Sequence, residues 1–195
     1  MEGTTQDKLV AAAISLFALK GYAAVSIREI AKAADVNVSS VSYYFRGKEG
    51  LYRAILREHA EAVAAAVFAG ESLSPEARLR HYAKAVCTVH AQRPFVTRFL
   101  LSEIVNPTSA LDIGLKKKTF SFFSFLTKAL EDGIDSGCFR NDLNVRHAAF
   151  SLAGILSFYF IAKPVFGESL ASSNETDADY VEQAVAIYLA GVRKN

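Results

Sequence analysis

The chain has 195 residues, 51% of them apolar, and a formal net charge of only +2 at neutral pH. This apolar content can fill a packed core, so the composition excludes an intrinsically disordered chain. The two cysteines, Cys87 and Cys138, lie far apart, which argues against a disulfide-stapled secreted domain and favours a reducing, cytoplasmic compartment. With four prolines, eleven glycines and no alternating apolar pattern, the chain is predicted to be all-α.

The first predicted helix runs from about Thr5 to Lys20, and Gly21 is expected to end it. Its apolar residues recur at spacings of three and four, so one face is expected to pack inward. These residues are Leu9, Ala13, Leu16 and Phe17. The other expected members of this core are Val25, Ile27, Ile30, Val36, Val41 and Phe45.

The stretch from Ser26 to Glu49 predicts two short helices joined by a tight turn. Ser26 and Glu29 have the spacing of a capping box, which marks the start of the first helix. The segment Asp35 to Asn37 interrupts the apolar pattern, because Asp and Asn side chains compete with helical hydrogen bonds. The second helix is expected from about Val38 to Phe45. This arrangement is that of a helix-turn-helix, whose second helix enters a DNA major groove.

Residues 5 to 57 resemble the DNA-binding domain of the TetR family of transcriptional regulators. The matching segments are Phe17 followed by Lys20-Gly21-Tyr22, the run SIREIAKAADV from Ser26, the run YYF from Tyr43 and the run KEGLY from Lys48. The resemblance implies a homodimer of all-α subunits, a palindromic DNA operator and a C-terminal domain that binds a small inducer. Many members have Thr-Leu-Tyr where this chain has Ser40-Val41-Ser42. The role of that tyrosine is therefore expected at Tyr43 or Tyr44.

The predicted DNA-binding residues follow from this motif. Arg28 and the residues from Asn37 to Ser42 are expected to face bases, while the remaining residues are expected to contact phosphate. The full set is Ser26, Arg28, Asn37, Val38, Ser39, Ser40, Ser42, Tyr43, Tyr44 and Lys48. The excess of basic residues around the motif is modest, so the motif supports this prediction more strongly than the charge does.

A long helix from Lys48 to about Ala69 is expected to connect the motif to the rest of the chain. The first clear break follows at Gly70 to Pro75, where Ser74 has the position of an N-cap and Pro75 that of the first helical residue. No flexible linker precedes this break. The domain boundary is therefore placed near residue 50, with a DNA-binding domain over 1–50 and a helical effector-binding and dimerisation domain over 51–195.

A second group of residues is predicted to bind the effector, on helices expected at about Pro75 to Gln92, Pro94 to Asn106 and Thr108 to Ser136 and on the helix that follows. Ligand pockets are mostly apolar with a few placed polar groups, and aromatic rings gather here around one histidine and one glutamate. The set is His90, Phe99, Glu103, Phe120, Phe123 and Tyr159. The alternative is that most of these residues belong to the core, with Glu103 in an internal salt bridge or a capping contact. Because Cys87 and His90 lack a second pair at ligand spacing, no metal or cofactor is predicted.

The last two predicted helices run from about Val145 to Lys163 and from about Asp177 to Arg193, with a loop from Pro164 to Glu175 between them. The first is apolar nearly all round, so it must be covered on more than one side. A twofold four-helix interface between two subunits would provide this cover; closure of the monomer core is the alternative. The uncharged run from Ala148 to Ala162 falls short of the ~20 residues of a membrane-spanning helix.

These features predict a cytoplasmic, dimeric transcription regulator, expected to be a repressor that a small, largely apolar or aromatic effector releases from a palindromic operator. The alternative is a helical ligand-binding or adaptor protein whose helix-turn-helix contacts protein. An enzyme is not predicted. The sequence has no phosphate-binding glycine loop, no metal-ligand set and no nucleophile beside a base.

Overall fold

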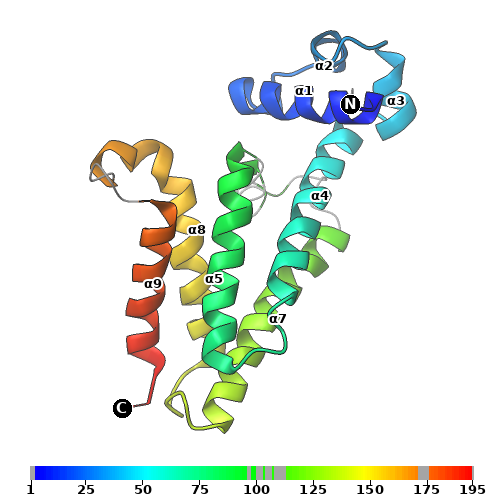
Figure 1. The fold of residues 1–195 in the computed structure, drawn as a ribbon. Helices are drawn as coiled ribbons and strands as arrows, with labels where there is room; N and C mark the ends of the chain where they lie inside the picture. The colour runs from blue at the N-terminus through cyan, green and yellow to red at the C-terminus, as the bar shows by residue number, and fades with distance from the viewer. Residues whose placement is uncertain are drawn as a thin grey trace. The chain divides into compact units, whose positions relative to one another are not determined.

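The computed structural model describes residues 3–95, 98–99, 103, 107, 113–170 and 176–194. Its helices are α1 Thr5–Lys20, α2 Ile27–Ala33, α3 Ser39–Phe45, α4 Lys48–Phe68, α5 Pro75–Gln92, α7 Ile113–Asp135, α8 Val145–Leu170 and α9 Asp177–Val192 (Figure 1). The predicted all-α class is confirmed for these residues. Most of the helix expected at 94–106, and the expected start of the next at 108–112, lie outside the described residues.

The chain forms two compact units. The first unit contains residues 1–59 and 95–115, and the second contains residues 60–94 and 116–195. The helix α4 contributes its first half to one unit and its second half to the other. The segment between α5 and α7 belongs to the first unit although the helices on both sides of it belong mainly to the second. The functional boundary expected near residue 50 stays a prediction.

The core of the first unit forms where α1, α2 and α3 pack on one another. Phe17 is buried there, as expected, together with Leu9, Ala13, Val25, Ile30 and Val41. The other expected core residues, Leu16, Ile27, Val36 and Phe45, are half-buried. The first turns of α4 add Leu51, Tyr52, Ile55 and Leu56 as buried residues. Periodicity shows which face of a short helix is apolar, but not which neighbour covers it.

Side-chain caps fix the starts of three helices. The predicted capping box of Ser26 and Glu29 is confirmed at α2. Equivalent boxes begin α1, from Thr4 and Asp7, and α9, from Thr176 and Asp179. Each box satisfies amide groups that the first helical turn leaves without partners.

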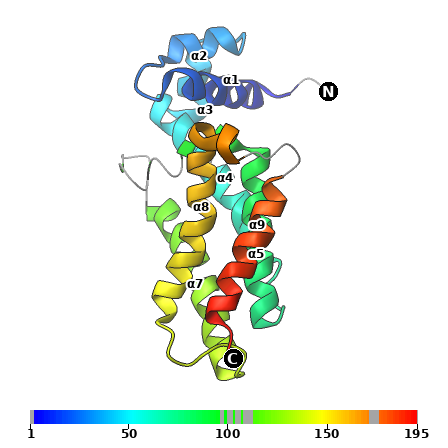
Figure 2. The same ribbon diagram turned by 90° about the vertical axis from the view of Figure 1, so that its left-hand side faces the viewer.

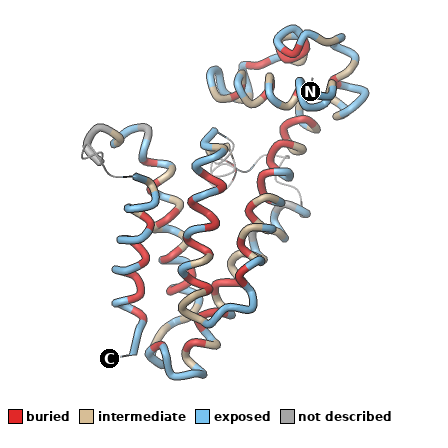
Figure 3. The backbone as a smooth tube through the Cα atoms, in the orientation of Figure 1, coloured by how far each residue is buried: buried red, intermediate tan, exposed pale blue. Residues whose placement is uncertain are grey.

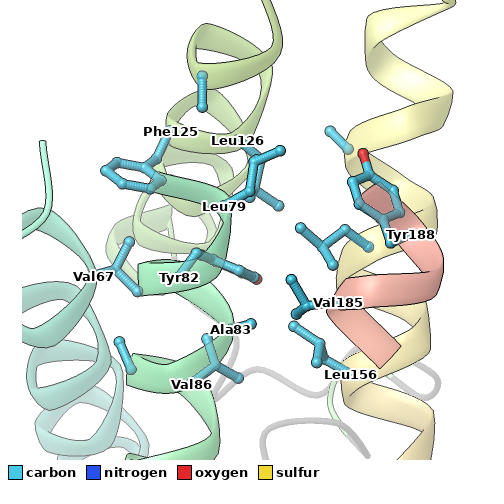
Figure 4. Close-up of a cluster of buried hydrophobic side chains, with 14 of the residues drawn as sticks. Val67, Leu79, Tyr82, Ala83, Val86, Phe125, Leu126, Leu156, Val185 and Tyr188 are labelled. Atoms are coloured by element: carbon cyan, nitrogen blue, oxygen red, sulfur yellow. The ribbon is translucent and has the colours of Figure 1, made fainter. Parts of the chain in front are cut away.

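The second unit is built around α5, which packs against both α8 and α9. Its apolar residues Leu79, Tyr82, Ala83 and Val86 meet side chains of the surrounding helices in the core (Figure 4). Along α9, buried and exposed positions alternate with helical periodicity (Figure 3). The buried positions of α9 include Val185 and Leu189.

The expected loop after Lys163 is wrong, because α8 continues through Pro164 to Leu170. The backbone φ of proline is compatible with a helix. Pro164 has no N–H group, so the carbonyl of Phe160, four residues earlier, loses its helical hydrogen bond. A single lost hydrogen bond does not end a helix of 26 residues. Figures 1 and 2 show α8 bending in its orange, C-terminal part, as expected where proline interrupts the hydrogen-bond ladder.

Candidate nucleic-acid interface

The turn between α2 and α3 is set by backbone geometry at Asp35. This residue has a φ of 52°, in the left-handed region that Asp adopts more readily than most residues. The Asp35 amide donates to the Lys32 carbonyl and the Val36 amide to the Ala31 carbonyl, which is the hydrogen-bond pattern of a Schellman motif. The sequence predicted a break here, and the structure shows that the break closes α2 and redirects the chain into α3.

The start of α3 is capped from the residue before its N-cap. Asn37 Oδ1 accepts hydrogen bonds from the Ser39 amide, at 2.9 Å, and from the Ser39 hydroxyl, at 2.7 Å. These contacts use the amide oxygen of Asn37 and the single O–H donor of Ser39. The Asn37 NH₂ group and the lone pairs of the Ser39 hydroxyl retain hydrogen-bonding capacity for another molecule.

The outward side of the motif is open. Val41 is buried and Ser40 is half-buried, whereas all the other predicted contact residues from α2 and α3 are exposed. They are Ser26, Arg28, Asn37, Val38, Ser39, Ser42, Tyr43 and Tyr44. Tyr43 is 81% exposed, and its ring packs edge-on against Tyr44 at 4.9 Å. Two exposed tyrosines on so short a helix suit a surface that contacts another molecule.

Lys48 differs from the other predicted contact residues. Its Nζ donates to the backbone carbonyls of Tyr22, at 3.0 Å, Ala23, at 3.4 Å, and Val25, at 2.9 Å. The ammonium also lies 4.4 Å from the centroid of the Tyr22 ring. An ammonium has three N–H donors, so these carbonyls occupy all of them. The phosphate contact expected of Lys48 stays a prediction. A phosphate would have to compete with these three carbonyls for the ammonium.

One acidic group next to the motif is neutralised locally. Glu29 forms a salt bridge of 2.8 Å with Lys20 at the end of α1. This bond and the hydrogen bonds from Ser26 lower the pKa of Glu29 to about 2. The carboxylate of the capping box is therefore fully charged at neutral pH and paired, which reduces its repulsion of an anionic partner.

The six predicted effector residues lie in three places. His90 and Tyr159 are buried in the second unit, where both rings contact Phe160, at 5.1 Å and 5.2 Å respectively. The Tyr159 hydroxyl donates to Asp177 at 2.7 Å. Burial, and then this carboxylate, raise the pKa of Tyr159 above its ordinary value. Asp177 becomes a neighbour of Tyr159 only through folding, and the ring of Phe160, the next residue in the chain, meets that of His90 only through folding.

The other four effector candidates form two further groups. Phe120 is 69% exposed on α7, and Phe123 is half-buried on the same helix, 5.7 Å from the Phe150 ring. Phe99 and Glu103 belong to the first unit, where the Phe99 ring packs 6.0 Å from that of Tyr52. The sequence predicted that all four line one site, but residue spacing along a helix does not show which neighbours a helix face meets.

Two family models match the chain. The model described as bacterial regulatory proteins of the tetR family matches residues 9–55, and the one described as the tetracyclin repressor-like C-terminal domain matches residues 75–186. A solved TetR-family protein from Rhodococcus RHA1 superposes with a TM-score of 0.84 at 23% identity, over 100% of both chains.

Two curated relatives are also transcriptional regulators. The repressor NicS of Pseudomonas putida is 25% identical, over 97% of this chain and 93% of its own length. The probable regulator YttP of Bacillus subtilis is 49% identical over 61 residues, which cover 31% of this chain and 30% of that protein. The second match therefore spans less than a third of either protein. With both family models matched and the helix-turn-helix in place, the chain belongs to the TetR family of transcriptional regulators, and α2 and α3 form its DNA-binding motif.

Proposed function

We propose that this protein is a homodimeric repressor that binds a palindromic operator through α2 and α3 and is released by a small, largely apolar or aromatic effector. The observation that carries the proposal is the exposed, hydroxyl-rich and aromatic side of α3, with Arg28 exposed on α2. The relative NicS is named a repressor, which supports that direction of regulation. A cytoplasmic location fits the two free thiols, Cys87 and Cys138.

Within this proposal the exposed side chains have two roles. Arg28, Asn37 and Ser39 read bases, with Val38, Ser40 and Ser42 beside them. Ser26, Tyr43 and Tyr44 contact phosphate, and in doing so position α3 in the groove. An arginine can bind the O6 and N7 atoms of guanine together, and the Asn37 amide can donate to base edges. The recognition helices of two subunits would read half-sites one turn of DNA apart.

The outer face of α8 supports the dimer. The helix presents Phe150, Phe158, Ile161 and Val165 as exposed side chains, with exposed Gly154 between them. These residues follow one another at spacings of three and four, so they share one face. The neighbouring helix α9 adds exposed Ile187, and α8 and α9 lie side by side (Figure 2). Apolar side chains repeated along one helix face require cover by another molecule.

The residues Val145–Lys163 of α8 are also long and apolar enough, by length and composition, to cross a membrane, and 33% of that window is buried. The opposite face of the same helix carries Leu152 and Leu156, which are buried in the core of the second unit. Among the described side chains of α8, the face that carries Phe158 is largely exposed, whereas the face that carries Leu152 and Leu156 is covered. A second copy of the pair α8 and α9 fits this requirement, because a twofold interface of this kind covers one face of each helix.

We place the effector beside His90, Tyr159 and Phe160 in the second unit. The Phe160 ring packs edge-on against both His90 and Tyr159, so this place combines aromatic surface with two polar groups, which is the usual composition of a small-molecule site. Phe99, Glu103, Phe120 and Phe123 were expected to share this role. Phe99 and Glu103 lie in the first unit, and Phe120 is exposed on α7. We therefore limit the proposed effector site to the residues around Phe160.

The deciding experiment selects bound sequences from a random DNA pool with the purified protein and then measures affinity for the selected sequence against salt. We expect an enriched palindrome with a steep salt dependence. Arg28→Ala should weaken binding to that sequence by about 10–100-fold and random DNA much less. Arg140→Ala, which removes an exposed arginine of the second unit, is the control. Equal losses on both DNAs for Arg28→Ala would remove its base-reading role. A folded dimer that enriches no sequence would favour the adaptor alternative.

A further inference from the structure

The side chain of Lys48 connects two parts of the helix-turn-helix that are distant in sequence. Lys48 is the first residue of α4 and follows α3 after only two residues, Arg46 and Gly47. Its three acceptors, the carbonyls of Tyr22, Ala23 and Val25, lie in the turn before Ser26, the N-cap of α2. One ammonium therefore holds the beginning of α2 to the end of α3. The relative orientation of those helices determines whether Arg28 and α3 reach DNA together.

Lys48 rests on a stack of aromatic rings. Its ammonium lies over the Tyr22 ring, and Tyr22 packs 4.5 Å from Tyr52 and 5.4 Å from Phe17. Tyr52 is buried, and its phenol forms a hydrogen bond with the Glu103 carboxylate. Burial is the main cause that raises the pKa of Tyr52 above its ordinary value, and the Glu103 carboxylate raises it further. These contacts form a continuous path from Glu103 through Tyr52 and Tyr22 to Lys48.

The far end of this path comes from a different part of the chain. Glu103 is only 3% exposed and belongs to the first unit, as does Phe99, whose ring is 6.3 Å from Phe17. Both residues are in the segment that links α5 to α7, two helices that lie mainly in the second unit. A displacement of this segment would change the support of the ring on which Lys48 rests. Coupling of this kind passes through packed, hydrogen-bonded neighbours.

We propose that Lys48 is a positioning residue, which orients α2 and α3 by holding the turn from Tyr22 to Val25, and that Glu103 supports it through Tyr52 and Tyr22. Lys48 then acts on DNA binding without donating to phosphate. The inference rests on the proposed function and extends it, because it names the path by which the segment between α5 and α7 reaches the DNA-binding helices.

The first test is Lys48→Arg, assayed on the selected operator in the full-length protein. Arginine keeps the charge and binds phosphate well, but its planar guanidinium cannot direct three donors at three converging carbonyls as an ammonium does. We expect operator affinity to fall about tenfold or more, the value of one charged hydrogen bond, while the slope of affinity against salt stays that of the wild type. Lys32→Arg, at an exposed position of α2, is the matched control and should change neither. The proposal would be overturned if Lys48→Arg bound the operator as tightly as the wild type does and Lys48→Met reduced the slope of affinity against salt by about one. Those two results together would show that Lys48 contacts a phosphate.

The second test does not depend on DNA. Amide hydrogen exchange is measured in the folded protein for residues 22 to 28. Lys48→Met and Glu103→Gln should both accelerate exchange in this turn, and their effects on it should not add, because both act through one path. Unchanged exchange in Lys48→Met, or additive effects in the double variant, would overturn the proposal.

If Lys48→Met does not fold, Glu103→Gln and Tyr52→Phe supply the exchange measurement. If the wild-type protein selects no DNA sequence, the proposed function fails. The hydrogen-exchange measurement does not use DNA, so it tests the positioning role of Lys48 independently.

Discussion

The closest backbone approach among the described glycines occurs at Gly50, in the first turn of α4. A Cβ atom at this position would lie 1.7 Å from the carbonyl oxygen of Phe45, the last residue of α3. The obstructing atom belongs to the backbone, so it cannot move by a change of rotamer. The corner between α3 and α4 therefore requires a residue without a side chain.

Gly50→Ala should lower the free energy of unfolding by about 1–3 kcal/mol or more, as overpacking does, and should weaken operator binding because α3 must shift. Urea denaturation followed by circular dichroism measures the first effect. The control is Gly191→Ala in the last turn of α9, where nothing lies within 4 Å of an added Cβ. That change should be neutral or slightly stabilising, since alanine favours a helix more than glycine does. Equal stability of the two variants would show that the α3–α4 corner relaxes freely.

The acid sensitivity of α2 depends on Glu29. Its pKa is about 2 in the folded protein, against an ordinary value of 4.5. A folded-state pKa below the unfolded one means that the charged carboxylate stabilises the folded state above about pH 4.5, and that this contribution is lost as the pH falls towards 2. Glu29→Gln should therefore have a lower urea midpoint than the wild type at pH 7, and the two midpoints should converge below pH 4.5. A difference that stays constant down to pH 3 would mean that the charge of Glu29 does not contribute.

Local chemistry explains which residues of the site could be predicted from the sequence. The capping box of Ser26 and the break at Asp35 depend on neighbours within four residues, so a pattern is enough to find them. Lys48 has its acceptors 23 to 26 residues away, and its role depends on how α1, α2 and α4 pack. The left-handed backbone of Arg46, with a φ of 60°, cannot be predicted from the sequence, because arginine carries no signal for that conformation.

At the scale of helices, the bounds of α1, α4 and α5 could be predicted because periodicity and end signals agree there. The error at α8 came from treating Pro164 as an obligatory helix end. Proline disfavours a helix but does not forbid one, and the helical path continues for six further residues to Leu170. The six effector candidates show a related limit of prediction from the sequence. Helical projection identifies a face, while the neighbours of that face depend on packing between helices.

Pro164→Ala distinguishes a helix from a loop by the sign of its effect. In a helix, alanine restores the hydrogen bond to the Phe160 carbonyl, so the free energy of unfolding should rise by up to about 3 kcal/mol. In a loop, the same change should lower it by about 0.4–1 kcal/mol, because the unfolded chain gains freedom. Thermal and urea denaturation give the sign. A loss of stability would contradict the extended α8.

At the scale of the whole molecule, the exposed apolar face of α8 is the feature that a single chain leaves unexplained. The sequence predicted that this helix needs cover on more than one side, and the structure separates the buried side, with Leu152 and Leu156, from the exposed one. The sequence could not make this separation, because an all-round apolar helix has no polar face to mark the solvent. What covers the exposed face remains our proposal of a second subunit.

Phe158→Arg tests that proposal at the centre of the face, where the side chain is 66% exposed. A charge there would be buried without a partner in a twofold interface, so the dimer should dissociate. Sedimentation should then show a monomer, and affinity for the palindrome should fall towards that for one half-site, because the two helix-turn-helix motifs are no longer linked. The fold should persist, because the Phe158 side chain is mostly exposed and does not belong to the buried core cluster of the second unit.

Phe120→Arg is the matched control, because Phe120 is 69% exposed on α7 and the substitution adds the same charge. This variant should remain dimeric and bind the palindrome as the wild type does. Dimers in both variants would place the interface elsewhere on the molecule. A wild-type protein that is monomeric in solution but binds lipid vesicles, with binding abolished by Phe158→Arg, would show that α8 is covered by a membrane instead.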